Sequence, residues 1–104
     1  MTEEVQDALL EAAKVLETIG PTLGRPTVDT LNGSRYANMK ELRFDADQGV
    51  WRVAFAFDAR RQAILLVAGD KRGLSRKMQA KFYRDLVAKA DDRFGRYNRH
   101  IERG

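Results

Sequence analysis

Three short segments with the alternation of β-strands follow one another in the middle of this chain of 104 residues. They cover residues 39–44, 49–55 and 64–72, and each contains a lysine or an arginine. The intervening residues 45–49 and 58–61 have the composition of turns that join antiparallel strands. The chain is therefore predicted to form a small antiparallel β-meander with a positively charged surface, which suits a polyanion such as RNA.

The middle segment predicts which side chains share a face, because successive side chains of a strand point to opposite faces. One face collects Trp51, Val53, Phe55 and Phe57. Arg52 points to the other face, where Ala54 and Ala56 are small enough to leave room for a ligand. Residues 63–68 are apolar throughout, which is typical of a central strand.

An amphipathic helix is predicted on each side of these strands in the sequence. Residues 3–19 repeat apolar side chains every three or four positions, and Gly20 ends this helix. The second helix begins at Ser75, a suitable N-cap, and carries a long apolar stripe. Gly95 is a position where this second helix is expected to end or bend.

The fold class follows from the order of these elements. Residues 20–38 are predicted to form an irregular loop, with Val28 and Leu31 holding a short helical turn against the core. Strands flanked by helices predict an α+β fold: a small antiparallel sheet of three to four strands, with the N-terminal and C-terminal helices packed on one of its faces. A single domain covering residues 1–104 is expected.

Composition narrows the classes of function. The net charge of +4 and the pI near 9.7 favour an acidic partner. With no cysteine and one histidine, His100, the chain excludes disulfides, thiolate zinc sites and histidine-rich metal sites, so we expect neither metal nor cofactor. An acidic N-terminus and the lack of a long apolar run predict a cytoplasmic protein with no membrane segment.

Four segments are similar to a known group of proteins: residues 33–43, 50–55, 65–71 and 81–83. In this order and at these spacings they resemble the phage-type HigB toxins of the RelE/ParE superfamily, and the resemblance extends over roughly residues 15–95. It implies a small antiparallel sheet with N-terminal helices on one side and a C-terminal helix nearby. It also implies ribosome-dependent cleavage of mRNA, with the ribosome, mRNA and a helix-turn-helix antitoxin as partners.

Such cleavage without a metal uses the 2′-hydroxyl of the substrate as the nucleophile. The protein must help to deprotonate it, stabilise charge on the phosphoryl oxygens and protonate the leaving 5′-oxygen. A site without histidine or paired carboxylates can still act if clustered cations lower the pKa of a lysine. Clustered cations also bind phosphate directly, and arginine can do so through two hydrogen bonds.

Two strand cations match this chemistry best. Arg52 matches the family's arginine on the second strand and is the candidate phosphate clamp; the alternative is a surface arginine paired with Glu41 or Asp58. Lys40 matches a basic residue on the first strand and is the candidate general base or a second electrostatic stabiliser. Its alternative is an ordinary exposed edge-strand lysine. We expect the charged groups of Lys40, Arg52 and Lys71 to converge on one concave spot.

The remaining strand and helix candidates are weaker. Lys71 and Arg72 resemble the family's basic pair after the third strand, although a solvated turn would look the same. Tyr83 matches the helix tyrosine, which stacks on a base or donates a proton; the alternative is packing at the edge of the apolar stripe. Arg43 is predicted to lie on the opposite strand face from Lys40 and therefore ranks lower, as an RNA-binding residue.

His100 and Glu41 complete the candidates. His100 is a possible acid or base near the C-terminus, where a terminal histidine without a role is the simpler interpretation. Glu41 can orient Lys40 or Arg52, with a weak cross-strand ion pair as the alternative. A basic series on the second helix can follow an RNA backbone or be a solvated helix face: Arg76, Lys77, Lys81 and Arg84.

Two other functions remain open. A ParE-like gyrase poison has the same fold, but cations on all three strands argue against it. A non-catalytic RNA- or protein-binding module is the second alternative, because the sequence has no strong histidine or carboxylate pair for acid–base work.

Overall fold

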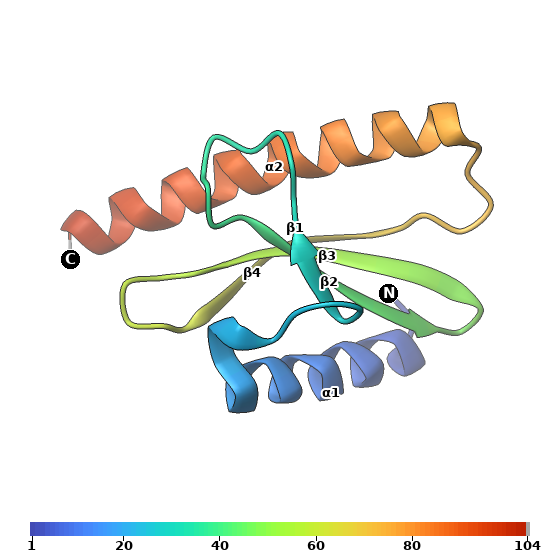
Figure 1. Ribbon diagram of the computed structural model, residues 1–104, viewed down its shortest axis with the longest axis horizontal. Coiled ribbons are helices and arrows are strands. Elements are labelled where there is room, and N and C mark those ends of the chain that lie inside the picture. Colours follow the sequence, from blue (N-terminus) through green and yellow to red (C-terminus); the bar gives the residue numbers. More distant parts are fainter. Residues whose placement is uncertain (104) are drawn as a thin grey trace.

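The computed structural model describes residues 1–103, in which a four-stranded antiparallel sheet lies between two long helices (Figure 1). The elements are α1 (Glu3–Ile19), the 3₁₀ turn η1 (Gly20–Thr22), β1 (Val28–Thr30), β2 (Lys40–Ala46), β3 (Gly49–Phe57), β4 (Ala63–Asp70) and α2 (Arg76–Arg103). The strands lie side by side in the order β1-β2-β3-β4. The predicted α+β class and the antiparallel meander are confirmed, and β1 extends the meander to four strands.

Both long helices begin where the sequence predicts. The Thr2 hydroxyl accepts a hydrogen bond from the Val5 amide at 3.2 Å, and the Ser75 hydroxyl accepts one from Met78 at the same distance. These caps satisfy amides that have no partner within their helix. At the other end of α1, Gly20 takes φ 77°, a left-handed conformation that glycine adopts without a steric penalty.

Gly95 does not interrupt α2, so the predicted end or bend there is wrong. A Cβ at this position would lie 3.0 Å from the Tyr36 hydroxyl oxygen. The glycine therefore lets the loop that carries Tyr36 approach the helix closely, and this packing compensates for the lower helix propensity of glycine.

The two helices cover opposite faces of the sheet, as Figure 1 shows, and not one face as predicted. Against α1 lies a cluster of buried side chains: Leu16, Val28, Leu42, Val53 and Phe55. Against α2 lies a second cluster, which includes Met39, Ala54, Ala56, Leu66, Leu86, Ala90 and Phe94. The reason is that β3 is apolar on both faces along half of its length, so each face requires its own cover.

Ala54 and Ala56 therefore have a different role from the predicted one. Both are fully buried beneath α2, in the same cluster as Phe94. Their small size makes room for the helix and leaves no room for a ligand at these positions. Only the end of β3 near Arg52 extends beyond this packed region.

Two strands also differ from the prediction. Val28 lies in β1, paired with Leu42 of β2, so this segment is extended and not a helical turn. β4 is an edge strand and not a central one, and it is apolar because each helix covers part of it. In residues 1–103, no helix combines the length and apolar character that crossing a membrane requires.

Candidate functional site

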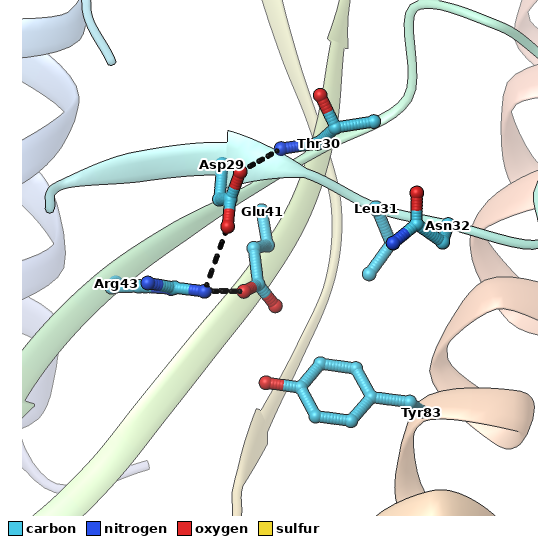
Figure 2. A pocket seen from close by; sticks show the side chains of 7 residues that line it. All are labelled: Asp29, Thr30, Leu31, Asn32, Glu41, Arg43 and Tyr83. Atoms are coloured by element: carbon cyan, nitrogen blue, oxygen red, sulfur yellow. Dashed lines mark hydrogen bonds and ion pairs between the residues drawn. The ribbon is translucent and has the colours of Figure 1, made fainter. Parts of the chain in front are cut away.

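A charge network lies on the α2 side of the sheet, between β1 and β2. Arg43 Nη2 is 2.7 Å from Glu41 Oε1 and 3.2 Å from Asp29 Oδ2. Figure 2 shows these three side chains together, with Tyr83 reaching toward them from α2. Glu41, which is only 4% exposed, raises the pKa of Arg43 through this contact. Two carboxylates therefore fix the position of Arg43 and neutralise its charge.

Arg52 lies directly opposite Arg43 in the register of β2 and β3. Like charges at directly opposed positions destabilise a sheet, so packing alone does not account for this pair. Arg52 Nη1 donates to the Trp51 carbonyl at 2.8 Å, and Arg52 Nε is buried without a hydrogen-bond partner in the described residues. Within residues 1–103, Arg52 forms no ion pair with a carboxylate, so its charge is available to an anion.

Lys71 and Tyr83 adjoin this pair. Lys71 Nζ lies 5.5 Å from the centroid of the Tyr83 ring, a cation–π distance. Burial, and then the charge of Arg52, lower the pKa of Lys71. Burial and the Glu41 carboxylate raise the pKa of Tyr83, although Arg52 opposes this shift. Lys71 is therefore a lysine that gives up its proton more readily than usual, and the Tyr83 hydroxyl keeps its proton.

A cavity of about 300 Å³ opens beside the network. Its lining is drawn in Figure 2: Asp29, Thr30, Leu31, Asn32, Glu41, Arg43 and Tyr83. Glu41 Oε2 is buried there and has no hydrogen-bond partner among the described residues, whereas Oε1 is held by Arg43. A buried carboxylate oxygen without a donor is costly, and it is free to accept a hydrogen bond from a bound molecule.

Lys40 lies on the other face of the sheet. It shares its face with Leu42 and is paired with Phe55, and both of these belong to the core against α1. The predicted convergence of Lys40, Arg52 and Lys71 is therefore wrong for Lys40. Arg43, which ranked lower, lies beside Arg52 because it is three positions from Lys40 and so points the opposite way. For the same reason, Glu41 contacts Arg43 and does not orient Lys40.

The other predicted cations are on the surface. Arg72 is exposed, and its amide donates to Asp70 at 2.9 Å. Four exposed cations lie along the first half of α2: Arg76, Lys77, Lys81 and Arg84. Lys81 pairs with Asp85 at 2.7 Å, whereas Arg84 lines a second cavity beside Tyr83. Arg84 is therefore the member of this series that lines a cavity together with Tyr83.

His100 is far from this cluster. It is exposed on α2, 17 residues after Tyr83. At 1.5 Å per residue, this separation is about 25 Å along the helix axis. The structure therefore separates the possible acid–base histidine from Arg52 and Lys71.

Asp29 and Asn32 lie at the site but were not predicted from the sequence. Asp29 was part of a segment predicted to be irregular, and only the pairing of β1 with β2 brings it to Arg43. The Thr30 amide, and then Arg25, lower the pKa of Asp29, so it stays ionised. Asn32 follows β1 and forms a wall of the cavity. No local pattern marks either residue, because their positions depend on pairing between distant segments.

Comparison with known proteins gives consistent results. The family described as "Phage derived protein Gp49-like (DUF891)" matches residues 1–95. "Putative toxin HigB2" of Mycobacterium tuberculosis (strain ATCC 25618 / H37Rv) is 41% identical over 104 residues, covering 98% of this chain and 49% of that protein. "Putative toxin HigB3" of the same organism is 49% identical over 73 residues, covering 70% and 62%. The chain thus spans about half to two thirds of the length of these relatives. The resemblance to HigB toxins is confirmed. No solved structure matches the chain.

Proposed function

The chain belongs to the phage-derived Gp49-like family, and we propose that it is the toxin of a toxin–antitoxin system that cleaves mRNA on the ribosome. The similarity to relatives named as HigB toxins supports the toxin role. The uncompensated Arg52, placed opposite Arg43 and beside Lys71, carries the proposal of a nuclease. Such a protein acts in the cytoplasm, and its partners are mRNA, the ribosome and a helix-turn-helix antitoxin.

Arg52 and Lys71 are proposed to bind the phosphate between two nucleotides. Neither charge is neutralised by an ion pair in the described residues, whereas that of Arg43 is. Charge-assisted hydrogen bonds from a guanidinium and an ammonium stabilise the extra negative charge on the phosphoryl oxygens in the transition state. Arg43 then serves mainly to hold Glu41 in place.

Glu41 and Lys71 are proposed to move the protons. Glu41 Oε2 accepts the proton of the 2′-hydroxyl, whose oxygen bonds to phosphorus while the bond from phosphorus to the 5′-oxygen breaks. Lys71, with its lowered pKa, gives a proton to the leaving 5′-oxygen. The products are a 2′,3′-cyclic phosphate and a 5′-hydroxyl end. Tyr83 keeps its proton and holds the ribose or base against α2.

Mapping of mRNA ends in cells tests this proposal. The wild-type chain, Arg52→Ala and Lys40→Ala are expressed, and new 5′ ends and their chemistry are recorded by sequencing. We expect codon-phased cuts with 5′-hydroxyl ends that disappear in Arg52→Ala. Lys40→Ala is the matched control, since it removes a strand cation from the other face of the sheet, and it should cut normally.

Other outcomes would assign the alternatives. Growth arrest with DNA damage and intact mRNA would indicate a gyrase poison. The absence of toxicity and of cuts would indicate a non-catalytic binding module. Loss of the cuts in Lys40→Ala together with normal cuts in Arg52→Ala would overturn the site.

A further inference from the structure

The loop between β1 and β2 contains an asparagine followed directly by a glycine, Asn32 and Gly33. Asn32 lines two cavities: the first, which opens beside the charge network, and a second of about 380 Å³ against α2. Figure 2 shows its side chain among the residues of the first cavity. The amide of Asn32 carries no charge, so a carboxylate formed at this position would change the charge of both cavities.

The surroundings of Asn32 and Gly33 leave both residues open to reaction. They are exposed and lie in a turn. In residues 1–103, neither the Asn32 side chain nor the Gly33 amide takes part in a hydrogen bond; the neighbours Leu31 and Ser34 form those of the loop. Gly33 takes φ 89°, and apart from its chain neighbours no described atom lies within 4 Å of the place that a Cβ would occupy.

An asparagine in this setting can react with its own backbone. The Gly33 nitrogen bonds to Cγ of Asn32, the bond from Cγ to Nδ2 breaks, and Nδ2 leaves as ammonia with the proton of the Gly33 amide. The product is a cyclic succinimide. Water opens one of its two carbonyl–nitrogen bonds, which gives aspartate or, with the main chain running through the side-chain carbon, isoaspartate. A following glycine favours the ring closure, because it has no Cβ to hinder the attack.

The two other asparagines of the chain are protected from this reaction. Asn38 Nδ2 donates to the Phe57 carbonyl at 3.1 Å, and the backbone amide that follows Asn38 is also hydrogen-bonded. Asn98 lies within α2, where the backbone amides are bonded along the helix. Each is followed by a residue with a long side chain. Asn32 therefore stands apart from both in exposure of the reacting atoms.

Conversion of Asn32 would change the charge balance of the first cavity. Its lining already holds two carboxylates, Asp29 and Glu41, and both of them bind its one guanidinium, Arg43. A third carboxylate would find no unengaged cation in this lining. It would repel RNA phosphates and weaken their binding on the order of tenfold, as expected for one unit charge roughly 10 Å away at an effective dielectric constant of about 20.

We propose that Asn32 is a site of spontaneous deamidation, and that its conversion weakens RNA binding as the protein ages. The conversion itself depends on the exposed turn, whereas its effect on RNA rests on the proposed function. Water is the only reactant needed besides the chain. Each molecule of the protein would then stay fully active for a limited time, which the reaction of this one amide determines.

Incubation of the purified wild-type chain at neutral and at mildly alkaline pH tests the conversion. Peptide mapping by mass spectrometry follows each asparagine with time. We expect Asn32 to become a mixture of aspartate and isoaspartate over days, and faster at the higher pH, because the attacking nitrogen must lose its proton. Asn38 and Asn98 should stay intact. Persistence of Asn32, or equal conversion of all three, overturns the site.

Two variants check the reaction itself. Gly33→Ala places a Cβ beside the attacking nitrogen and should slow the conversion of Asn32. Because alanine is strained at the positive φ of Gly33, Asn32→Gln is the second variant. Its longer side chain requires a larger ring and should remain unconverted over the same period. Conversion of Asn32 at the wild-type rate in Gly33→Ala would contradict attack by the Gly33 nitrogen.

Binding of a 2′-O-methyl RNA hexanucleotide, which has no free 2′-hydroxyl and cannot be cleaved, tests the consequence. Fully converted wild-type protein should bind about tenfold more weakly than fresh protein. Asn32→Gln should bind equally before and after incubation, whatever its starting affinity. Asn32→Asp should bind weakly from the start. Asn98→Asp is the matched control, because it adds the same charge 15 residues after Tyr83, about 22 Å along α2, and should bind like fresh wild type.

The outcomes separate the ageing reaction from the proposed function. Full conversion of Asn32 with unchanged RNA affinity, while Arg52→Ala loses affinity, overturns the ageing effect and leaves the proposed function standing. If the wild type binds no RNA, or if Arg52→Ala binds as well as the wild type, the proposed function is overturned and the ageing effect with it. The mass spectra still decide whether Asn32 converts.

Discussion

The two faces of the sheet are built on different principles. The face toward α1 is closed by apolar packing around Leu16 and Phe55, both fully buried. The face toward α2 is closed in the same way at one end, by Phe94 over Ala54. At its other end, it holds a buried carboxylate oxygen and a buried guanidinium nitrogen that lack partners within the described residues.

This difference separates stability from function within one small sheet. Burial of apolar surface favours folding, whereas buried polar atoms without partners oppose it. Opposed arginines on β2 and β3 add a further cost. Because these buried polar atoms and opposed arginines do not stabilise the fold, we expect them to serve a function, and the binding and cleavage of RNA would account for them. Substitutions on the two faces should therefore have separable effects.

The largest expected effect is on catalysis, from Glu41→Gln on the α2 face. The amide keeps the shape and can still accept a hydrogen bond from Arg43, but it cannot take the proton of the 2′-hydroxyl. The rate of cleavage on ribosomes should fall by roughly 10²–10⁴, the usual contribution of a general base. A single-turnover assay with saturating ribosomes measures it.

The same variant must remain folded for that result to count. Loss of one charged partner of Arg43 should lower the free energy of unfolding by roughly 1–2 kcal/mol. Urea unfolding followed by circular dichroism measures this change. Cleavage at the wild-type rate by Glu41→Gln would remove Glu41 from the mechanism.

On the α1 face, Phe55→Ala should have the largest effect on stability. Phe55 is fully buried and packs edge-on to Phe57 at 5.6 Å between ring centroids. Its truncation should lower the free energy of unfolding by about 3–5 kcal/mol, a large share of the stability of a small domain. The folded fraction should still cleave RNA. Leu10→Ala, at a position that is 62% exposed, is the control and should change stability by less than about 0.5 kcal/mol.

Much of the fold could be predicted because it depends on local signals. Alternation in β3, the Ser75 cap and the apolar stripe of α2 all lie within one element. The placement of the helices on opposite faces could not be predicted in this way. It depends on Ala54 and Ala56, whose small size is equally compatible with an open surface and with a closely packed helix.

The site was only partly predictable because its members meet through strand register. The turn between β2 and β3 has two residues, Asp47 and Gln48, both at positive φ. This turn pairs Ala46 with Gly49 and so places Arg43 opposite Arg52. Asp-Gln is not the Asn-Gly or Asp-Gly pair that usually marks such a turn, so the sequence did not reveal the register. If a two-residue turn had been assumed, strand alternation would have placed Arg43, and not Lys40, beside Arg52 in the predicted site.

A smaller effect is expected where α2 approaches the sheet. A Cβ at Gly69, which is paired with Arg52, would lie 2.6 Å from the Phe82 ring. Gly69→Ala should therefore destabilise the chain by about 1–3 kcal/mol through overpacking. It should also slow cleavage, since the shifted helix carries Tyr83. Gly24→Ala, where no atom lies within 4 Å of the new Cβ, should change neither quantity. Equal effects of the two substitutions would contradict close packing at this point.

The smallest expected effect is a shift in the pH dependence of the cleavage rate. It tests whether the charges of Lys71 and Arg52 influence each other at the polar end of the α2 face. Burial and Arg52 lower the pKa of Lys71 below its ordinary value of 10.5. As the pH rises through that lowered pKa, Lys71 loses the proton that it is proposed to donate, so the cleavage rate should fall earlier than for an ordinary lysine. Lys71→Arg does not titrate in this range and should remove the fall, although its overall rate is lower.

The free energy of unfolding should depend on the same pKa, but it should change with pH in the opposite direction from the cleavage rate. Between the lowered pKa and 10.5, the unfolded chain binds a proton that the folded chain does not, so the free energy of unfolding should rise with pH in this window. Titration of the Lys71 side chain by carbon-13 NMR measures the pKa directly. Arg52→Gln should raise this pKa toward 10.5, because it removes one of the three causes that lower it, whereas Lys40→Gln on the other face should leave it unchanged. An unchanged pKa in Arg52→Gln would show that burial and Arg43 lower it without Arg52, and that Arg52 and Lys71 do not share one anion.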